Sequence, residues 1–196
     1  MKVIGHTTRP AGNIILTLTV FLMMVPICTA QDWSRKGKSE FFGVFQTMGG
    51  DTTTGLGITL EMSDFTLYGL GLGYNPTDHW NVNTNLLFGS TDITGTELGI
   101  TVTDDCSIWG WDVNLDYNIL KDRLTPLVSA GIGFFNLNSF GASETDFSYK
   151  LGAGLRWDVT DNLSLKAMYN CTWTTMEDTD SALQLDGFSF GIAYMF

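Results

Sequence analysis

Large apolar residues alternate with small or polar ones along most of the chain after residue 40. In residues 109–119 every second position is Trp, Val, Leu, Tyr or Ile, and the positions between are Gly, Asp or Asn. A repeat of two places successive side chains on opposite faces of a β-strand. Eight segments show the pattern: residues 41–48, 66–74, 80–88, 109–119, 128–134, 147–159, 163–175 and 188–196.

The connections between these predicted strands alternate in length. Short turns are expected at residues 75–79, 121–125 and 160–162, with Pro76 and Pro126 in or beside them, where a missing N–H does least harm. Longer polar segments, expected to be loops, cover residues 49–64, 92–105, 139–146 and 176–182. An even number of strands with short periplasmic turns and long outer loops is typical of barrels in bacterial outer membranes.

The polarity of the two strand faces indicates which face lines the lumen and which faces the surroundings. A soluble barrel would put the apolar rows inside, but an eight-stranded lumen is too narrow for so many Trp, Tyr and Phe side chains. A β-sandwich with an aromatic core is the other alternative. Turned outward, the apolar rows meet lipid, and closure satisfies the backbone hydrogen bonds. We therefore predict an all-β, eight-stranded antiparallel up-and-down transmembrane β-barrel, in which either face of the first strand could point to lipid.

The N-terminus has the features of a signal peptide. Lys2 and Arg9 precede an apolar run of about 14 residues, shorter than the roughly 20 of a spanning helix, and Ala30 marks the expected cleavage point. The predicted organisation is a signal peptide over residues 1–30, a short periplasmic leader over residues 31–38 and the barrel over residues 39–196.

Charge and cysteine content exclude several classes of function. The net charge is −11, and removal of residues 1–30 leaves eight basic against 21 acidic residues, a net charge of −13. So acidic a chain is a poor partner for nucleic acid. Cys106 and Cys171 either form a disulfide or act as two small apolar fillers. The sequence contains no Cys/His cluster with zinc spacing, and we expect no cofactor.

Charged residues on the inward faces form the most informative candidate site. The predicted faces place six of them in the lumen: Asp112, Asp116, Lys150, Arg156, Asp158 and Lys166. Arg156 and Lys166 are nearly equidistant from the turn at residue 161, so we expect them to be cross-strand neighbours, with Asp116 as their first partner. The cluster is either a structural plug that fixes strand register or a gate whose ion pairs rearrange to open a pore.

The expected loops are acidic and contain no Lys or Arg. One hypothesis is that five of their carboxylates bind divalent cations shared with lipopolysaccharide phosphates, since Ca²⁺ and Mg²⁺ prefer oxygen ligands; these are Asp104, Asp105, Glu177, Asp178 and Asp180. The alternative is a solvated, repulsive surface. We assign no metal site firmly, because the spacing of an EF-hand is missing.

Several stretches resemble the OmpA/OmpX-type family of small outer-membrane barrels, over roughly residues 39–196. They are residues 68–76, 125–134, 152–157 and 161–165, together with the terminal Phe196. The resemblance implies an eight-stranded barrel in the outer membrane of a Gram-negative-type bacterium. It also implies that Tyr194 and Phe196 belong to the C-terminal signal read by the barrel-assembly machinery.

These observations favour a structural or surface-interaction role in the cell envelope. A narrow porin-like channel for small solutes or ions is the alternative. A lipid-modifying barrel enzyme is a minor alternative, because such hydrolases need a nucleophile with a positioned base, and His79, the only histidine after His6, falls in a short turn. Expected partners are outer-membrane lipid, lipopolysaccharide, the barrel-assembly machinery and an unidentified partner of the loops.

Overall fold

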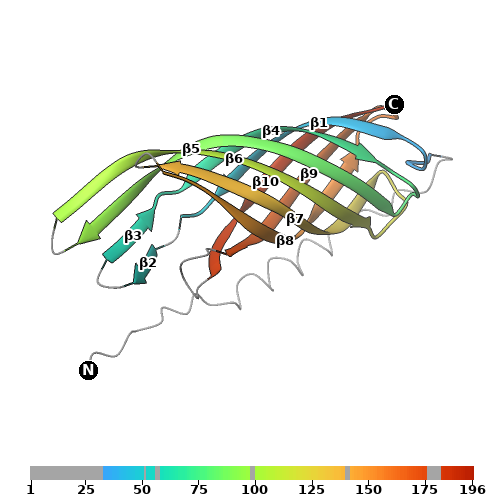
Figure 1. Cartoon of the computed structure of the whole chain (residues 1–196). Helices are drawn as coiled ribbons and strands as arrows, with labels where there is room; N and C mark the ends of the chain where they lie inside the picture. The colour runs from blue at the N-terminus through green and yellow to red at the C-terminus, as the bar shows by residue number, and fades with distance from the viewer. Residues whose placement is uncertain (1–32, 51, 56–57, 98–99, 140–141, 176–181) are drawn as a thin grey trace, which may run out of the picture.

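The chain forms a closed antiparallel barrel in the computed structural model, which describes residues 33–50, 52–55, 58–97, 100–139, 142–175 and 182–196 (Figure 1). Neighbouring wall strands in the chain pair with each other, and the last pairs with the first to close the wall. The wall consists of β1 (Ser39–Met48), β4 (Phe65–Tyr74), β5 (Trp80–Glu97), β6 (Ile100–Asn118), β7 (Leu124–Ser139), β8 (Ala142–Asp158), β9 (Leu163–Thr175) and β10 (Ala182–Met195). The predicted eight-stranded up-and-down barrel is confirmed.

The described part of the chain contains no helix with the length and apolar character needed to cross a membrane.

Three of the segments expected to be loops are largely strand, and that expectation was wrong. Residues 49–64 contain the hairpin of β2 (Thr52–Gly55) and β3 (Ile58–Met62), and β3 pairs with β5. In place of the loop 92–105, β5 and β6 stay paired up to Glu97 and Ile100 and run past the other strands in Figure 1. Likewise β7 and β8 pair through most of residues 139–146.

Threonine explains why the β5–β6 hairpin stays paired beyond the predicted strands. The hydroxyls of Thr94 and Thr103 lie 3.1 Å apart, and those of Thr96 and Thr101 lie 3.2 Å apart. β-branched side chains favour strands, and cross-strand Thr pairs stabilise them. A polar composition therefore indicated a loop where the residues form a solvent-exposed ladder.

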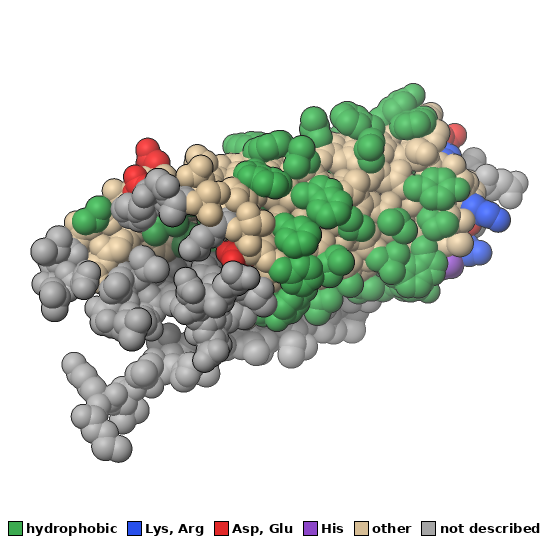
Figure 2. Space-filling view, in the orientation of Figure 1, with side chains coloured by type: hydrophobic (Ala, Val, Ile, Leu, Met, Phe, Trp, Pro, Cys, Tyr) green, Lys and Arg blue, Asp and Glu red, His purple; other side chains and the backbone are tan. Residues whose placement is uncertain are grey.

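The outer face of the wall is apolar around the middle and the short-turn end. Tyr68 is 61% exposed and Ile192 is 62% exposed, whereas Asp112 and Arg156 point inward and are buried. Figure 2 shows hydrophobic side chains, in green, over a broad part of the face in view. The predicted orientation of the two faces is thus confirmed. For β1, which the pattern left open, Phe41 points outward and the even-numbered residues point inward.

The polarity of the wall reverses toward the loop end. Leu86 is 42% exposed on the outside, while the next residue, Leu87, is 2% exposed and faces the lumen. Above them Ser90 and Asp92 are exposed on the outer face. The lumen there is filled by an apolar layer, which consists of Met48, Phe65, Leu67, Leu87, Cys106, Ile108, Phe135 and Leu185. A wall that leaves hydrocarbon for water must bury its apolar side chains inside.

Glycines on the inner face provide the room for the lumen side chains. A Cβ at Gly71 would overlap the ring of Phe42, and a Cβ at Gly131 would overlap the side-chain amide of Asn114. The lumen of this barrel is consequently packed with side chains.

Candidate functional site

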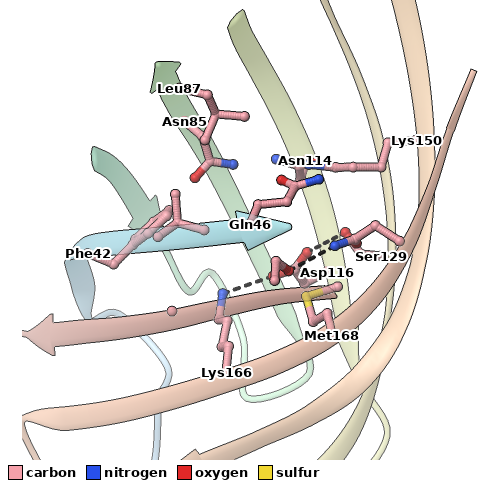
Figure 3. Close-up of a pocket in the computed structure, with 14 residues that line it drawn as sticks. Phe42, Gln46, Asn85, Leu87, Asn114, Asp116, Ser129, Lys150, Lys166 and Met168 are labelled. Atoms are coloured by element: carbon pink, nitrogen blue, oxygen red, sulfur yellow. Dashed lines mark hydrogen bonds and ion pairs between the residues drawn. The ribbon is translucent and has the colours of Figure 1, made fainter. Parts of the chain in front are cut away.

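Two lysines reach into the middle of the lumen, and each is paired with an aspartate of β6. Lys150 Nζ of β8 lies 2.7 Å from Asp112 Oδ2, and Lys166 Nζ of β9 lies 2.9 Å from Asp116 Oδ2. Figure 3 shows Lys166 and Asp116 joined in this way, with Asp116 also linked to Ser129. These pairs tie β6 to β8 and β9, which are not its hydrogen-bonded neighbours in the wall.

Asparagine side chains donate hydrogen bonds to both aspartates, and Ser129 Oγ donates to the remaining oxygen of Asp116, Oδ1, at 2.7 Å. The Nδ2 groups of Asn85 and Asn114 donate to Asp112 Oδ1 at 2.5 and 2.6 Å, and Asn83 Nδ2 donates to Asp116 Oδ2 at 3.0 Å. A buried ion pair is tolerated only when further hydrogen bonds compensate its lost hydration. The asparagine rows on β5 and β6 provide those hydrogen bonds.

A second cluster lies nearer the short-turn end. Arg156 and Lys166 are register partners on β8 and β9, as their distance from the turn indicated. Arg156 Nη2 lies 2.5 Å from Glu40 Oε1, and its Nε lies 3.0 Å from Asp158 Oδ1, with all three side chains fully shielded. Lys166 Nζ is also 3.8 Å from Glu40 Oε2. Asp116, the partner expected for both cations, therefore contacts Lys166, whereas Arg156 pairs with Glu40 and Asp158.

The sequence reasoning missed Glu40 as a member of this cluster. Glu40 lies on β1, whose inward face the pattern left open. Phe41 and Phe45 point outward, but Phe42 and Val44 lie on the face of Glu40, so the local pattern did not specify which face is inside. Only the pairing of β1 in the closed wall places Glu40 in the lumen.

Arg35, which precedes the first strand, lies against the short-turn end of the barrel and was also missed. Its Nε lies 2.6 Å from Asp158 Oδ2, and its Nη1 donates to the carbonyls of Asp78 and Leu120 at 3.1 and 3.2 Å. Nη2 donates to the carbonyl of Asp122. The guanidinium is fully buried. The expected leader, over its described residues 33–38, thus packs against the barrel.

Asp78, in the turn between β4 and β5, holds the backbone of that segment. Its Oδ1 accepts hydrogen bonds from Ser34 Oγ at 2.6 Å and from the amides of Arg35 and Lys36 at 2.9 and 3.1 Å. Burial alone would raise the pKa of Asp78, but these hydrogen bonds outweigh burial and leave the pKa below its ordinary value.

A cavity of about 50 Å³ lies between the charge clusters and the apolar layer. Gln46 Nε2 and the Oδ1 atoms of Asn85 and Asn114 are buried there and have no hydrogen-bond partner among the described residues. A polar cavity of this size has room for a few ordered water molecules, which would bridge such groups.

The acidic residues of the expected loops are only partly described. Asp104 and Asp105 are consecutive on β6 and so lie on opposite faces, and Asp105 faces Asp92 across the strand pair. Glu177, Asp178 and Asp180 lie outside the described residues. Within the described ranges, no group of three or more His, Cys, Asp or Glu side chains could hold a metal ion.

The remaining candidate residues lie on the wall. Cys106 and Cys171 are free thiols, and Cys106 belongs to the apolar layer. Tyr194 and Phe196 are exposed on the outside. The backbone of Phe196 exchanges two hydrogen bonds with Ser39, at 2.9 and 3.0 Å, so the chain end forms part of the closing seam.

Comparison with solved structures places the fold among small outer-membrane barrels. The crystal structure of the outer membrane protein OprG from Pseudomonas aeruginosa superposes with a TM-score of 0.62 at 12% identity, covering 84% of this chain and 98% of that one. Neisserial surface protein A gives a TM-score of 0.59 at 14% identity, covering 82% of this chain and all (100%) of the other. The N-terminal barrel of OprF from P. aeruginosa gives 0.50 at 18%, covering 82% and 98%.

No curated protein matches the chain by sequence. A family model, however, matches nearly the whole chain, from residue 20 to residue 196. The chain therefore belongs to the family of the outer membrane protein beta-barrel domain.

Proposed function

We propose that this outer-membrane barrel is a closed structural and surface-interaction protein of the cell envelope, without catalytic activity. The observation that carries the proposal is the double occlusion of the lumen. The apolar layer fills it toward the loop end, and the paired charges fill it toward the short-turn end. In the cell, the short-turn end would face the periplasm and the acidic loop end the outside.

The apolar layer argues against the narrow-channel alternative. Leu67, Leu87 and Ile108 are at most 3% exposed and lie in the lumen. An ion that crosses such a layer loses its hydration without gaining polar partners, which costs many kcal/mol. A continuous polar path, which a channel for small solutes needs, would require these side chains to move apart.

The surroundings of His79 support a role without catalysis. Its Nδ1 lies 2.7 Å from the backbone carbonyl oxygen of Asn118, and its ring stacks on Tyr117 at a centroid distance of 5.6 Å. These contacts join the turn between β4 and β5 to the end of β6. A hydrolase would instead need a serine or another nucleophile within hydrogen-bond reach of the histidine.

Planar-bilayer recording of the purified barrel tests the proposal. We expect no stepwise conductance from the wild-type protein. The matched control is the Leu67→Ser/Leu87→Ser variant, in which polar side chains replace part of the apolar layer. Reproducible current steps from the wild type, at a barrel-to-lipid ratio where a known porin conducts, would show that the channel alternative is correct.

A further inference from the structure

We propose that residues 33–38 are a built-in plug, and that the short-turn mouth of the barrel is a guanidinium-binding site which Arg35 of the same chain fills. The inference goes beyond the proposed closed barrel, because it concerns a contact that can be removed while the apolar layer stays in place.

The acceptors around Arg35 match the shape of a guanidinium group. Asp158 comes from the end of β8, Leu120 and Asp122 from the turn between β6 and β7, and Asp78 from the turn between β4 and β5. A guanidinium presents its N–H donors in a planar fork, which a lysine ammonium cannot reproduce. One carboxylate and three converging carbonyls, all supplied by the barrel, therefore form a site for this chemical group.

The rest of the segment is folded to deliver Arg35 to that site. Gly37 adopts φ +82°, a left-handed conformation that favours glycine, and its amide donates to the carbonyl of Asn75 at 2.7 Å. Trp33 covers the guanidinium from outside, with Arg35 Cζ 4.7 Å from the ring centroid. Together with the hydrogen bonds to Asp78, these contacts hold the segment across the mouth.

Removal of Arg35 should loosen the plug without opening the whole lumen. Asp158 would lose the partner of its Oδ2 oxygen and become a buried carboxylate that Arg156 alone compensates. Ser164 is the natural reporter, because it is fully buried and is the register partner of Asp158 on β9. The rate at which a reagent modifies a thiol at this position would measure the fraction of molecules in which residues 33–38 are undocked.

The experiment uses the full barrel in detergent micelles, in a Cys106→Ala/Cys171→Ala background with Ser164→Cys as reporter. The readout is the rate of modification by a charged, water-soluble methanethiosulfonate. Labelling of a transiently opened site follows the population of the open form, so Arg35→Ala should raise the rate about tenfold or more. Lys36→Ala removes an exposed side chain of the same segment and keeps the backbone amide that binds Asp78, so it should leave the rate unchanged. Heat-modifiable migration on gels establishes that each variant is folded.

Chemical rescue separates a guanidinium site from general loosening. Methylguanidinium should slow labelling of the Arg35→Ala variant toward the wild-type rate, and methylammonium at the same concentration should not. With Thr174→Cys as reporter, at the loop end of the lumen, Arg35→Ala should have no effect. If Arg35→Ala does not fold, Arg35→Lys makes the same comparison with the charge retained.

Two outcomes overturn the proposal. Equal labelling of the Ser164→Cys reporter with and without Arg35 would show that residues 33–38 are no plug, and rescue by methylammonium as strong as by methylguanidinium would show that the mouth does not select the guanidinium group. Neither outcome bears on the conductance of the wild-type barrel, which tests the proposed function separately.

Discussion

Glu40 on the first strand of the wall and Arg156 on β8 meet across the lumen, with Glu40 Oε1 2.5 Å from Arg156 Nη2 and both side chains fully shielded from solvent. β1 also forms the closing seam with β10. The pair therefore ties the strand that closes the barrel to β8, from which β10 and β9 separate it in the wall.

Loss of this pair should be costly, because Glu40→Gln leaves Arg156 with less compensation in a dry environment. We expect the free energy of unfolding to fall by about 3–5 kcal/mol, as measured by urea titration of the barrel in lipid vesicles. Glu61→Gln, at an exposed carboxylate of the loop end, is the matched control. A Glu40→Gln variant as stable as the wild type would show that this charge network does not stabilise the barrel.

Leu86 and Leu87 are adjacent in sequence but lie on opposite faces of β5. Leu87→Ala leaves a cavity in the apolar layer and should cost about 2–5 kcal/mol of unfolding free energy. Leu86→Ala changes a side chain that contacts lipid or detergent and should cost clearly less. Both variants are compared by the same urea titration. Equal destabilisation would contradict the assignment of Leu87 to the apolar layer in the lumen and of Leu86 to the outer face.

Gly71 and Gly43 provide a second matched pair. An added methyl at Gly71 overlaps the ring of Phe42, whereas one at Gly43 meets no atom within 4 Å. Gly71→Ala should therefore cost about 1–3 kcal/mol through overpacking, and Gly43→Ala should be neutral. Thermal unfolding followed by the heat-modifiable gel shift measures both. Equal melting temperatures would mean that Phe42 and the backbone carbonyl of Thr84 move aside without cost.

Asp78 makes docking of residues 33–38 dependent on pH. Its pKa is lowered in the folded barrel, so its contribution to docking is present above the ordinary aspartate pKa of about 3.9 and is lost as the pH falls through the lowered value. The labelling rate of the Ser164→Cys reporter should rise as the pH drops below about 4, after correction with a small-molecule thiol. Asp78→Asn should show faster labelling at neutral pH and a flatter dependence. An identical pH dependence of both proteins would assign the effect to another group.

Local alternation was sufficient to predict the strand number, the pairing order and the orientation of the middle of the wall. In segments such as residues 109–119 the strand and its outward face can be assigned from the local sequence, because the two faces of the strand differ so strongly in chemistry. The inward charges on β6, β8 and β9 follow from the same parity, and so does the register of Arg156 with Lys166.

Tertiary structure decided three features that no local pattern specified. β1 has apolar residues on both faces, so closure against β10 and β4 determines that Glu40 points inward. A shift of one residue in that register would turn every side chain to the other face. Arg35 lies outside any strand, and its site consists of groups from two turns and β8 that meet only in the closed barrel.

The reversal of polarity along the wall is the third feature, and the local sequence indicates it only weakly. Pairs of adjacent large apolar residues, such as Leu86 with Leu87 and Phe134 with Phe135, occur where both faces are apolar. The sequence by itself determined a barrel whose outer face carries rows of large apolar side chains. Only the structure showed where the outer face changes from apolar to polar, because that depends on which strands stay paired beyond the apolar belt and enclose an apolar layer.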